Sequence, residues 1–256
     1  MAEKSWFRVL IAVAFLALIP LVLAGGLQAA NKENKRIGVA LLTREHEFYR
    51  ELEAGLATEA KKYNYKLSIL YGEFDHGKQA AQVDELIAKR VDALILAPCD
   101  SKAIGDAILK ANAAGIPVFT VDIANLSGKG KVVAHIASDN VEGGRQAARL
   151  MVEALKGKGK VVIINHPNVT SVMDRVSGFR EYLRDYPKVE IMADIPAWGQ
   201  RGRAMSIMED LLLMLPNLNG VFAINDDSVA GQAFLENGTR GFRKSTSVGE
   251  CFFYTH

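Results

Sequence analysis

The sequence is poor in the residues that usually build reactive or metal-bearing centres. Its 256 residues include two cysteines, Cys99 and Cys251, which are too few for a disulfide framework or a cysteine metal cluster. The stretch 46–50 (HEFYR) begins like a zinc-protease helix but lacks the second histidine. No Gly-x-Ser-x-Gly elbow is present, and the short Gly-Lys-Gly turns at 128–130 and 157–159 lack the other features of phosphate loops. We therefore expect a protein that is not an enzyme and that has no metal site and no cofactor.

An excess of charge of one sign is also lacking. The chain has 31 Lys and Arg residues against 29 Asp and Glu residues, for a formal net charge of +2. This near balance gives no reason to expect nucleic acid or an acidic membrane surface as the main partner. With 49% hydrophobic residues, the chain is long enough for one large or two modest globular domains.

One long apolar run is present, near the N-terminus. Lys4 and Arg8 precede the apolar residues 9–24, and small residues follow at 25–30. A basic start, an apolar centre and a small-residue end are typical of a secretory signal peptide. We therefore predict a signal peptide at 1–30 and a mature chain in the periplasm. The alternative is an uncleaved membrane anchor, because the run approaches the roughly 20 apolar residues that span a bilayer.

From residue 35 onward, short apolar segments alternate with segments of helical periodicity. The expected strands are 36–42, 66–71, 91–97, 117–121, 132–137, 160–165, 189–195 and 220–224. The expected helices are 48–63, 79–89, 101–114, 141–155, 172–184 and 203–215. Strands that are apolar throughout, with amphipathic helices between them, indicate parallel sheets covered on both faces.

The alternation restarts near 138–140, so the pattern predicts two successive βα arrays. We expect an α/β protein of two doubly wound parallel-sheet lobes joined by a hinge, with the second lobe incomplete. Polar residues follow several strands, and ligands of such sheets bind beyond the carboxyl ends of the strands. The predicted boundaries are 31–137 for the first lobe, 138–231 for the second lobe and 232–256 for an atypical C-terminal segment.

Three stretches resemble a known family. They are residues 133–144 (VAHIASDNVEGG), 175–179 (RVSGF) and 222–226 (FAIND). Together they are similar to the periplasmic sugar-binding proteins of ABC transporters, in the ribose/galactose-binding group, over residues 36–231. The resemblance implies the type I periplasmic-binding-protein fold, in which two lobes close round a monosaccharide or polyol and an ABC permease reads the closed shape. It also leads us to expect a monomer.

A different class of function stays open at this point. Sugar-responsive repressors share this ligand-binding fold, but they begin with a DNA-binding helix-turn-helix rather than a secretory signal. An exported receptor domain that passes the closed shape to a chemoreceptor or a sensor kinase fits the sequence. Neighbouring genes for a permease or for a kinase would separate transport from sensing.

In the first lobe, the resemblance implies four ligand-binding residues. Phe48 and Tyr49 stand where the family has stacking aromatics, although one of them would serve equally well in the helix core. His46 stands where a sugar-contacting Asn is common, and is either a ligand contact or an exposed residue at the helix start. Asp122 matches the family's carboxylate after the fourth strand, but Ile123 replaces the Arg that often follows it.

In the second lobe, the resemblance implies four further ligand-binding residues. Asp139 either touches the ligand or caps a helix, and for its neighbour Asn140 a cap and hinge role is expected. Arg175 matches a sugar-binding Arg, or forms a surface salt bridge. Trp198 resembles an aromatic that closes over the ring.

A gap-free comparison puts Gly199 at the place of that aromatic. Asn225 is expected to offer its amide to a sugar hydroxyl, while Asp226 or Asp227 caps the next helix.

The resemblance fails near the C-terminus. Glu250 and Cys251 replace the family's aromatic and sugar-binding Asp, and the polar residues 245–247 replace an apolar strand. We therefore expect the second lobe to lack part of its sheet, which leaves an unpaired edge and uncovered apolar surface. One hypothesis is a truncated or frame-shifted product that closes poorly, and the alternative is a natural short form. The sequence does not name the sugar, because positions 46, 123 and 199 depart from the family pattern.

Overall fold

The computed structural model describes residues 34–228, together with the backbone of residues 244–248 and 251–255. The predicted signal peptide and the replacement at Glu250 lie outside these residues. Within the described part of the chain, no helix is both long enough and apolar enough to cross a membrane.

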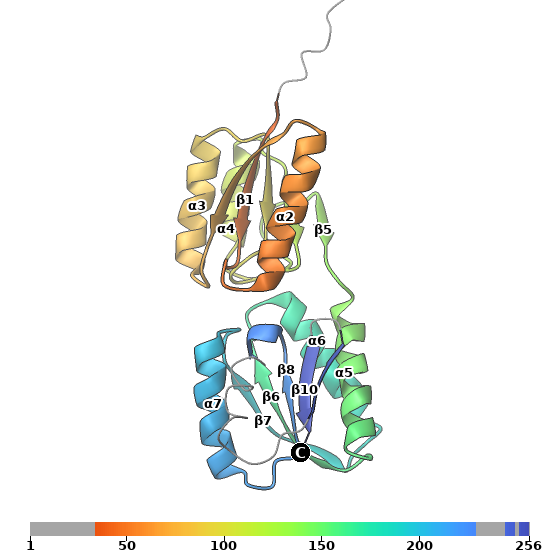
Figure 1. Ribbon diagram of the computed structural model, residues 1–256. Coiled ribbons are helices and arrows are strands. Elements are labelled where there is room, and N and C mark those ends of the chain that lie inside the picture. Colours follow the sequence, from red (N-terminus) through yellow and green to blue (C-terminus); the bar gives the residue numbers. More distant parts are fainter. Residues whose placement is uncertain (1–33, 229–243, 249–250, 256) are drawn as a thin grey trace, which may run out of the picture. The chain divides into compact units, whose positions relative to one another are not determined.

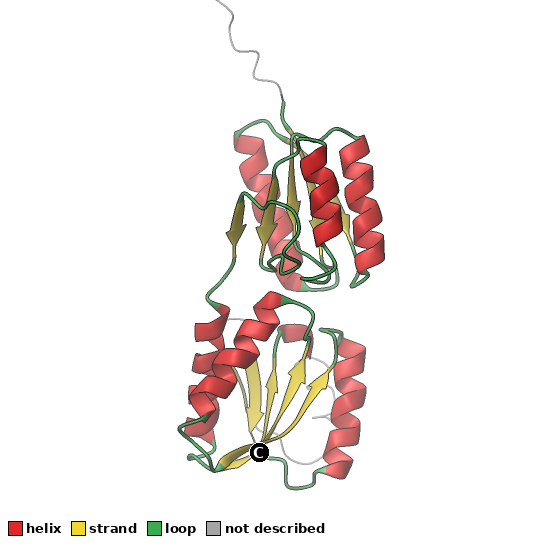
Figure 2. Cartoon of the chain, turned by 180° about the vertical axis from the view of Figure 1, so that it is seen from behind, coloured by secondary structure: helices red, strands yellow, loops and turns green. Residues whose placement is uncertain are grey.

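The first lobe is a five-stranded parallel sheet with helices on both faces (Figures 1 and 2). Its strands follow the order β2-β1-β3-β4-β5 across the sheet. The strands are β1 (Arg36–Leu41), β2 (Lys66–Tyr71), β3 (Ala93–Leu96), β4 (Val118–Val121) and β5 (Ala134–Ile136). The helices are α2 (Glu47–Lys62), α3 (His76–Ala88) and α4 (Gly105–Ala113).

Strand β1, which lies between β2 and β3, is apolar from Ile37 to Leu41 because both faces of the sheet are covered. Val39 and Leu41 belong to the same buried cluster as Tyr49 of α2. Ala40, which points to the opposite face, packs in the cluster that contains Leu86 of α3 and residues of α4. Successive side chains of a strand point to opposite faces, so each face of β1 meets a different set of helices. The parallel, doubly covered sheet predicted for this lobe is confirmed.

The second lobe contains parallel strands and an antiparallel addition. Its strand order is β7-β6-β8-β10-β9. The strands are β6 (Gly159–Asn165), β7 (Val189–Pro196), β8 (Gly220–Ala223), β9 (Lys244–Val248) and β10 (Cys251–Thr255). The helices are α5 (Asn140–Ala154), α6 (Thr170–Leu183) and α7 (Arg201–Met214). Strands β7, β6 and β8 are parallel to one another.

The expected unpaired edge does not lie at β8, which is paired on both sides. Strand β10 pairs with β8 in antiparallel register, with Phe253 opposite Phe222, and β9 pairs antiparallel with β10. The polar stretch 245–247, which was expected to replace a strand, lies within β9. Antiparallel pairing uses the same backbone N–H and C=O groups as parallel pairing, so the short strand β10 supplies partners for the backbone groups of β8.

Helices α5 and α6 cover one face of this sheet and approach each other closely. A Cβ atom at Gly144 would lie 1.9 Å from the carbonyl oxygen of Arg175, and one at Gly178 would lie 1.9 Å from the carbonyl oxygen of Val141. Glycine at both positions therefore allows the two helix backbones to touch. Below them, the rings of Phe179 and Phe222 stack 4.2 Å apart. On the opposite face, α7 packs against β6 and β8.

One helix starts later than predicted. The expected helix 101–114 begins at Gly105, because the carboxylate of Asp100 accepts hydrogen bonds from the backbone N–H groups of Lys102 and Ala103 and forms a turn there. Gly115 follows the helix with φ of +75°, as expected for a helix end. Both sheets belong to one compact unit that begins at Lys35, and the predicted lobe boundary near 138 stays a prediction.

Candidate functional site

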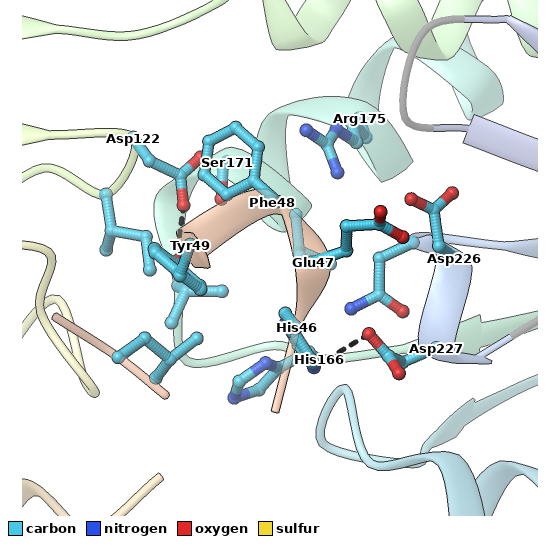
Figure 3. Close-up of a pocket in the computed structure, with 15 residues that line it drawn as sticks. His46, Glu47, Phe48, Tyr49, Asp122, His166, Ser171, Arg175, Asp226 and Asp227 are labelled. Carbon is cyan, nitrogen blue, oxygen red and sulfur yellow. Dashed lines mark hydrogen bonds and ion pairs between the residues drawn. The ribbon is translucent and has the colours of Figure 1, made fainter. Parts of the chain in front are cut away.

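A cavity of about 40 Å³ lies where the carboxyl ends of strands from both lobes meet. Its walls come from the segments after β1, β4, β6 and β8 and from the first turns of α6 (Figure 3). Of the eight residues predicted from the sequence, six line it: His46, Phe48, Tyr49, Asp122, Arg175 and Asn225. The volume of this cavity is far below the roughly 300–1,000 Å³ of small-molecule sites.

The start of α2 supplies an aromatic wall. The ring of Phe48, which is half-buried, meets the ring of Tyr49 edge to face at 5.0 Å. Tyr49 is buried in the core, yet its hydroxyl donates a 2.6 Å hydrogen bond to Asp122 Oδ2 (Figure 3). Tyr49 therefore takes the core role that was one of its two alternatives, and it orients the Asp122 carboxylate, while its contact with a ligand stays a prediction.

Asp122 follows β4 in a left-handed backbone conformation, with φ of +60°. Asp tolerates this region better than most residues, and the backbone N–H of Asp122 is fixed by a 2.8 Å bond to the carbonyl oxygen of Ile136. The next residue, Ile123, is buried and lines the cavity. An apolar side chain thus stands in the site where the family often has a guanidinium group.

His46 links the two lobes. It is buried, so the alternative of an exposed residue at the helix start is wrong. Its Nε2 atom lies 2.8 Å from the carbonyl oxygen of Gly199 and 3.6 Å from Asp227 Oδ2. Because a carbonyl oxygen can only accept, Nε2 carries the hydrogen of this bond. Asp227 Oδ1 also accepts a 3.1 Å bond from Arg201.

Arg175, on α6, is 5% exposed, so the alternative of a surface salt bridge is wrong. Its Nε donates to Asn140 Oδ1 and its Nη1 donates to the carbonyl oxygen of Ile224, both at 2.8 Å. These bonds hold a cationic, planar group at the cavity wall. Arg175 thereby connects the start of α5 with the end of β8.

Asp139 does not line the cavity, and its carboxylate caps α5 by accepting from the N–H of Glu142 at 3.0 Å. The cap role proposed for Asn140 therefore belongs to Asp139. Asn140 instead donates to the carbonyl oxygen of Ser138, near the predicted lobe boundary, and its Oδ1 accepts the bond from Arg175.

At the tip of β8, Asn225 itself caps the turn that follows. Its Oδ1 accepts a 2.9 Å hydrogen bond from the N–H of Ser228, so the prediction that Asp226 or Asp227 caps this helix is wrong. The residue before the first helical turn occupies the cap position, and the helix begins at Asp226. Asn225 and both aspartates line the cavity.

Trp198 is not among the residues that line the cavity. Its ring packs edge to face against His166, 6.0 Å away. The neighbouring Gly199 has φ of +69°, and a Cβ atom there would lie 3.2 Å from His166 Nδ1 and 3.4 Å from Asn225 Nδ2. A side chain at position 199 would therefore crowd two residues of the cavity wall.

His166 is a residue of the site that the sequence reasoning missed. It follows β6, lines the cavity and is 5% exposed. Burial, and secondarily the nearby charge of His46, lower the pKa of His166 to about 4, so the ring is neutral near pH 7. Its position directly after an apolar strand was the signal available, and the same signal had identified Asp122 and Asn225.

The cavity offers hydrogen-bond acceptors, donors and an aromatic face together. Carboxylates such as Asp122 accept, the Arg175 guanidinium and the Asn225 amide donate, and Phe48 provides an apolar surface. This set suits a small ligand with several polar groups and an apolar side. Among the described residues, no three His, Cys, Asp or Glu side chains are grouped as a metal site requires.

A family model described as a periplasmic binding protein domain matches residues 37–249. The ribose import binding protein RbsB of Bacillus subtilis is 36% identical over 205 residues, which are 79% of this chain and 66% of that protein. This chain thus spans about two thirds of that relative.

Solved structures give the same picture. A periplasmic solute-binding protein of an ABC transporter from Actinobacillus succinogenes, with bound D-allose, aligns with a TM-score of 0.71 and 29% identity, over 79% of this chain and 73% of that one. The fructose-binding periplasmic domain of a hybrid two-component system aligns with a TM-score of 0.74 and 30% identity, over 80% of this chain and 68% of that one.

Proposed function

We propose that this chain, which belongs to the periplasmic binding protein domain family, captures a monosaccharide or polyol between its two lobes and delivers it to an ABC permease. The relatives support this proposal, because they include a ribose import binding protein, a solute-binding protein with bound D-allose and a fructose-binding domain. The chain acts by binding and release and not as an enzyme. It works as a monomer in the periplasm, to which its N-terminal segment directs it.

The observation that carries the proposal is the composition of the cavity wall. Tyr49 orients the carboxylate of Asp122 from the first lobe, while Arg175 and Asn225 come from the second lobe. Planar charged and amide groups make directional hydrogen bonds to sugar hydroxyls, and the Phe48 ring can cover the C–H face of a sugar. A ligand that bonds to both sets of groups is held only when the lobes are together.

Ligand capture then follows from differential contacts. A sugar that bonds to one lobe gains further bonds when the second lobe reaches it, and this difference in free energy shifts the lobes toward the closed arrangement. The permease needs to distinguish only the two arrangements of the lobes. Specificity arises because a ligand with differently placed hydroxyl groups would be buried without forming these hydrogen bonds.

A thermal-shift screen tests the proposal directly. The purified chain is heated with D-ribose, D-allose, D-fructose, xylitol or myo-inositol. A ligand present at about 100 times its Kd stabilises the folded state by about 2.7 kcal/mol, which raises the Tm of a chain of this size by roughly 5–10 °C. Arg175→Met should abolish the shift, and the matched control Arg149→Met, which changes an exposed arginine of α5, should keep it. A folded chain whose Tm no sugar or polyol raises would refute the proposal.

Sensing is the second candidate, and the hybrid two-component relative favours it. In that case the same cavity binds the sugar, but the closed shape is read by a sensor kinase or chemoreceptor instead of a permease. Deleting the gene separates the two functions. Loss of sugar uptake indicates transport, whereas normal uptake with a lost transcriptional or chemotactic response indicates sensing.

A further inference from the structure

The first turn of α6 lacks a capping side chain of its own lobe. Helix α6 begins at Thr170, and the residue at its cap position is Val169, which makes no side-chain hydrogen bond to the helix. The first N–H groups of a helix have no partner within the helix and need an acceptor from elsewhere. Val has no polar atom in its side chain, so the acceptor has to come from another segment.

A serine of the first lobe supplies this acceptor. The N–H of Thr170 donates to Ser101 Oγ at 3.1 Å, and the N–H of Ser101 donates to the carbonyl oxygen of Asn168 at 2.9 Å. Ser101 follows β3 and is 1% exposed. Its carbonyl oxygen accepts a 2.7 Å bond from the N–H of Leu126, which fixes the loop within the first lobe.

The hydroxyl of Thr170 makes a further bond between the lobes. Thr170 Oγ1 accepts from the N–H of Ala124 at 2.7 Å, just after the Asp122 segment. Thr170 is 7% exposed, so these bonds are largely shielded from water. Neither Ser101 nor Thr170 is among the residues that line the cavity, whereas Ser171 and Arg175 on the same helix are.

We propose that Ser101 and Thr170 are positioning residues of a direct lobe-to-lobe latch, in which the first lobe caps α6 when the lobes meet. The inference rests on the proposed function, because it concerns the closed arrangement that a ligand selects. When the lobes part, the Thr170 N–H and the Ala124 N–H lose these acceptors. The latch therefore favours closure without any contact to the ligand.

Such a latch changes the affinity for every ligand but leaves the preference between ligands unchanged. The apparent Kd equals the intrinsic Kd divided by the fraction of molecules in the binding-competent arrangement. A change that lowers this fraction weakens every ligand by the same factor. Because Arg175 lies on α6, the latch also orders the helix that presents this guanidinium to the cavity.

The test uses Thr170→Val, which keeps the side-chain shape but removes the acceptor for Ala124. The Kd values of the two compounds from the screening panel that bind best are measured by calorimetry. One hydrogen bond of this kind corresponds to a loss of roughly 2- to 10-fold, and we expect the same factor for both compounds, with faster dissociation. Ser101→Ala should act in the same way, and Thr170→Ser should stay within about twofold of the original chain.

Thr58→Val is the matched control, because Thr58 Oγ1 bonds to the carbonyl oxygen of Ala54 on the exposed surface of α2. It should leave both Kd values unchanged. If Thr170→Val leaves both Kd values unchanged, the inference is overturned while the proposed function stands. The same holds if the variant changes the order of preference between the two compounds. An original chain that is folded but binds no member of the panel would overturn the proposed function, and this inference with it.

Discussion

Acidification should destabilise this protein through His166. The unfolded chain exposes this ring, which then has an ordinary pKa of about 6.5, whereas burial in the cavity wall lowers the pKa of His166 to about 4 in the folded state. As the pH falls below about 6.5, the unfolded state binds a proton that the folded state excludes. Stability is therefore lost between about pH 6.5 and pH 4 and falls no further for this group at lower pH.

The difference of about 2.5 pKa units corresponds to about 3 kcal/mol when the transition is complete. Between pH 7.5 and pH 5.0, the same two pKa values give a loss of about 2 kcal/mol. This is a large fraction of the 5–15 kcal/mol that stabilises typical domains. It should lower the Tm by roughly 4–8 °C for a chain of this size.

The assay is urea unfolding followed by circular dichroism at the two pH values, for the original chain and for His166→Gln. The variant lacks a titrating ring at this place, so its loss between pH 7.5 and 5.0 should be smaller by about 2 kcal/mol. Asp174, whose pKa is raised by burial, and the other carboxylates contribute equally to both chains and cancel. His76→Gln, at an exposed histidine at the start of α3, should keep the full loss. An equal loss in His166→Gln and the original chain would refute the reasoning.

Further predictions concern packing and buried hydrogen bonds. Gly178→Ala places a Cβ atom against the backbone of α5 and should lower the free energy of unfolding by at least about 2 kcal/mol. Gly55→Ala, on the open surface of α2, should instead raise the free energy of unfolding by about 0.5–1 kcal/mol. Phe179→Ala removes a fully buried stacked ring and should cost about 3–5 kcal/mol. Gln79→Leu leaves the N–H of Cys99 without its acceptor and should cost about 3 kcal/mol. Urea unfolding at pH 7.5 measures each change, and a loss below about 0.5 kcal/mol in any of the three destabilising variants would contradict its stated cause.

Much of the candidate site could be located from the sequence, because its residues follow apolar strands. Asp122 comes directly after β4, and Asn225 follows β8 after one further residue. The carboxyl ends of parallel strands meet at one edge of a sheet, so both residues reach the cavity. Their roles as ligand contacts stay predictions. Trp198, although it follows β7, packs against His166 instead of lining the cavity, since the left-handed turn at 198–199 sets its direction.

Other features could not be read from local pattern. Asp139, Asn140, Asp226 and Asp227 are all plausible caps by residue type, and only the backbone path shows that Asp139 and Asn225 occupy the cap positions. Likewise, the polar composition of 245–247 argued against a strand. Pairing with β10 outweighs that weak local preference.

The sequence by itself determined the α/β alternation, the parallel strands of both sheets and the edge at which polar residues collect. Each of these follows from apolar periodicity within a few neighbouring residues, since strands and helices bury their faces at periods of 2 and 3.6. The tertiary structure decided what each polar group binds. The bond between Ser101 and Thr170 joins residues 69 positions apart, and the low pKa of His166 comes from burial beside His46 of the other lobe. Such effects depend on which distant segments of the chain meet in space. No local pattern of residues shows which segments these are.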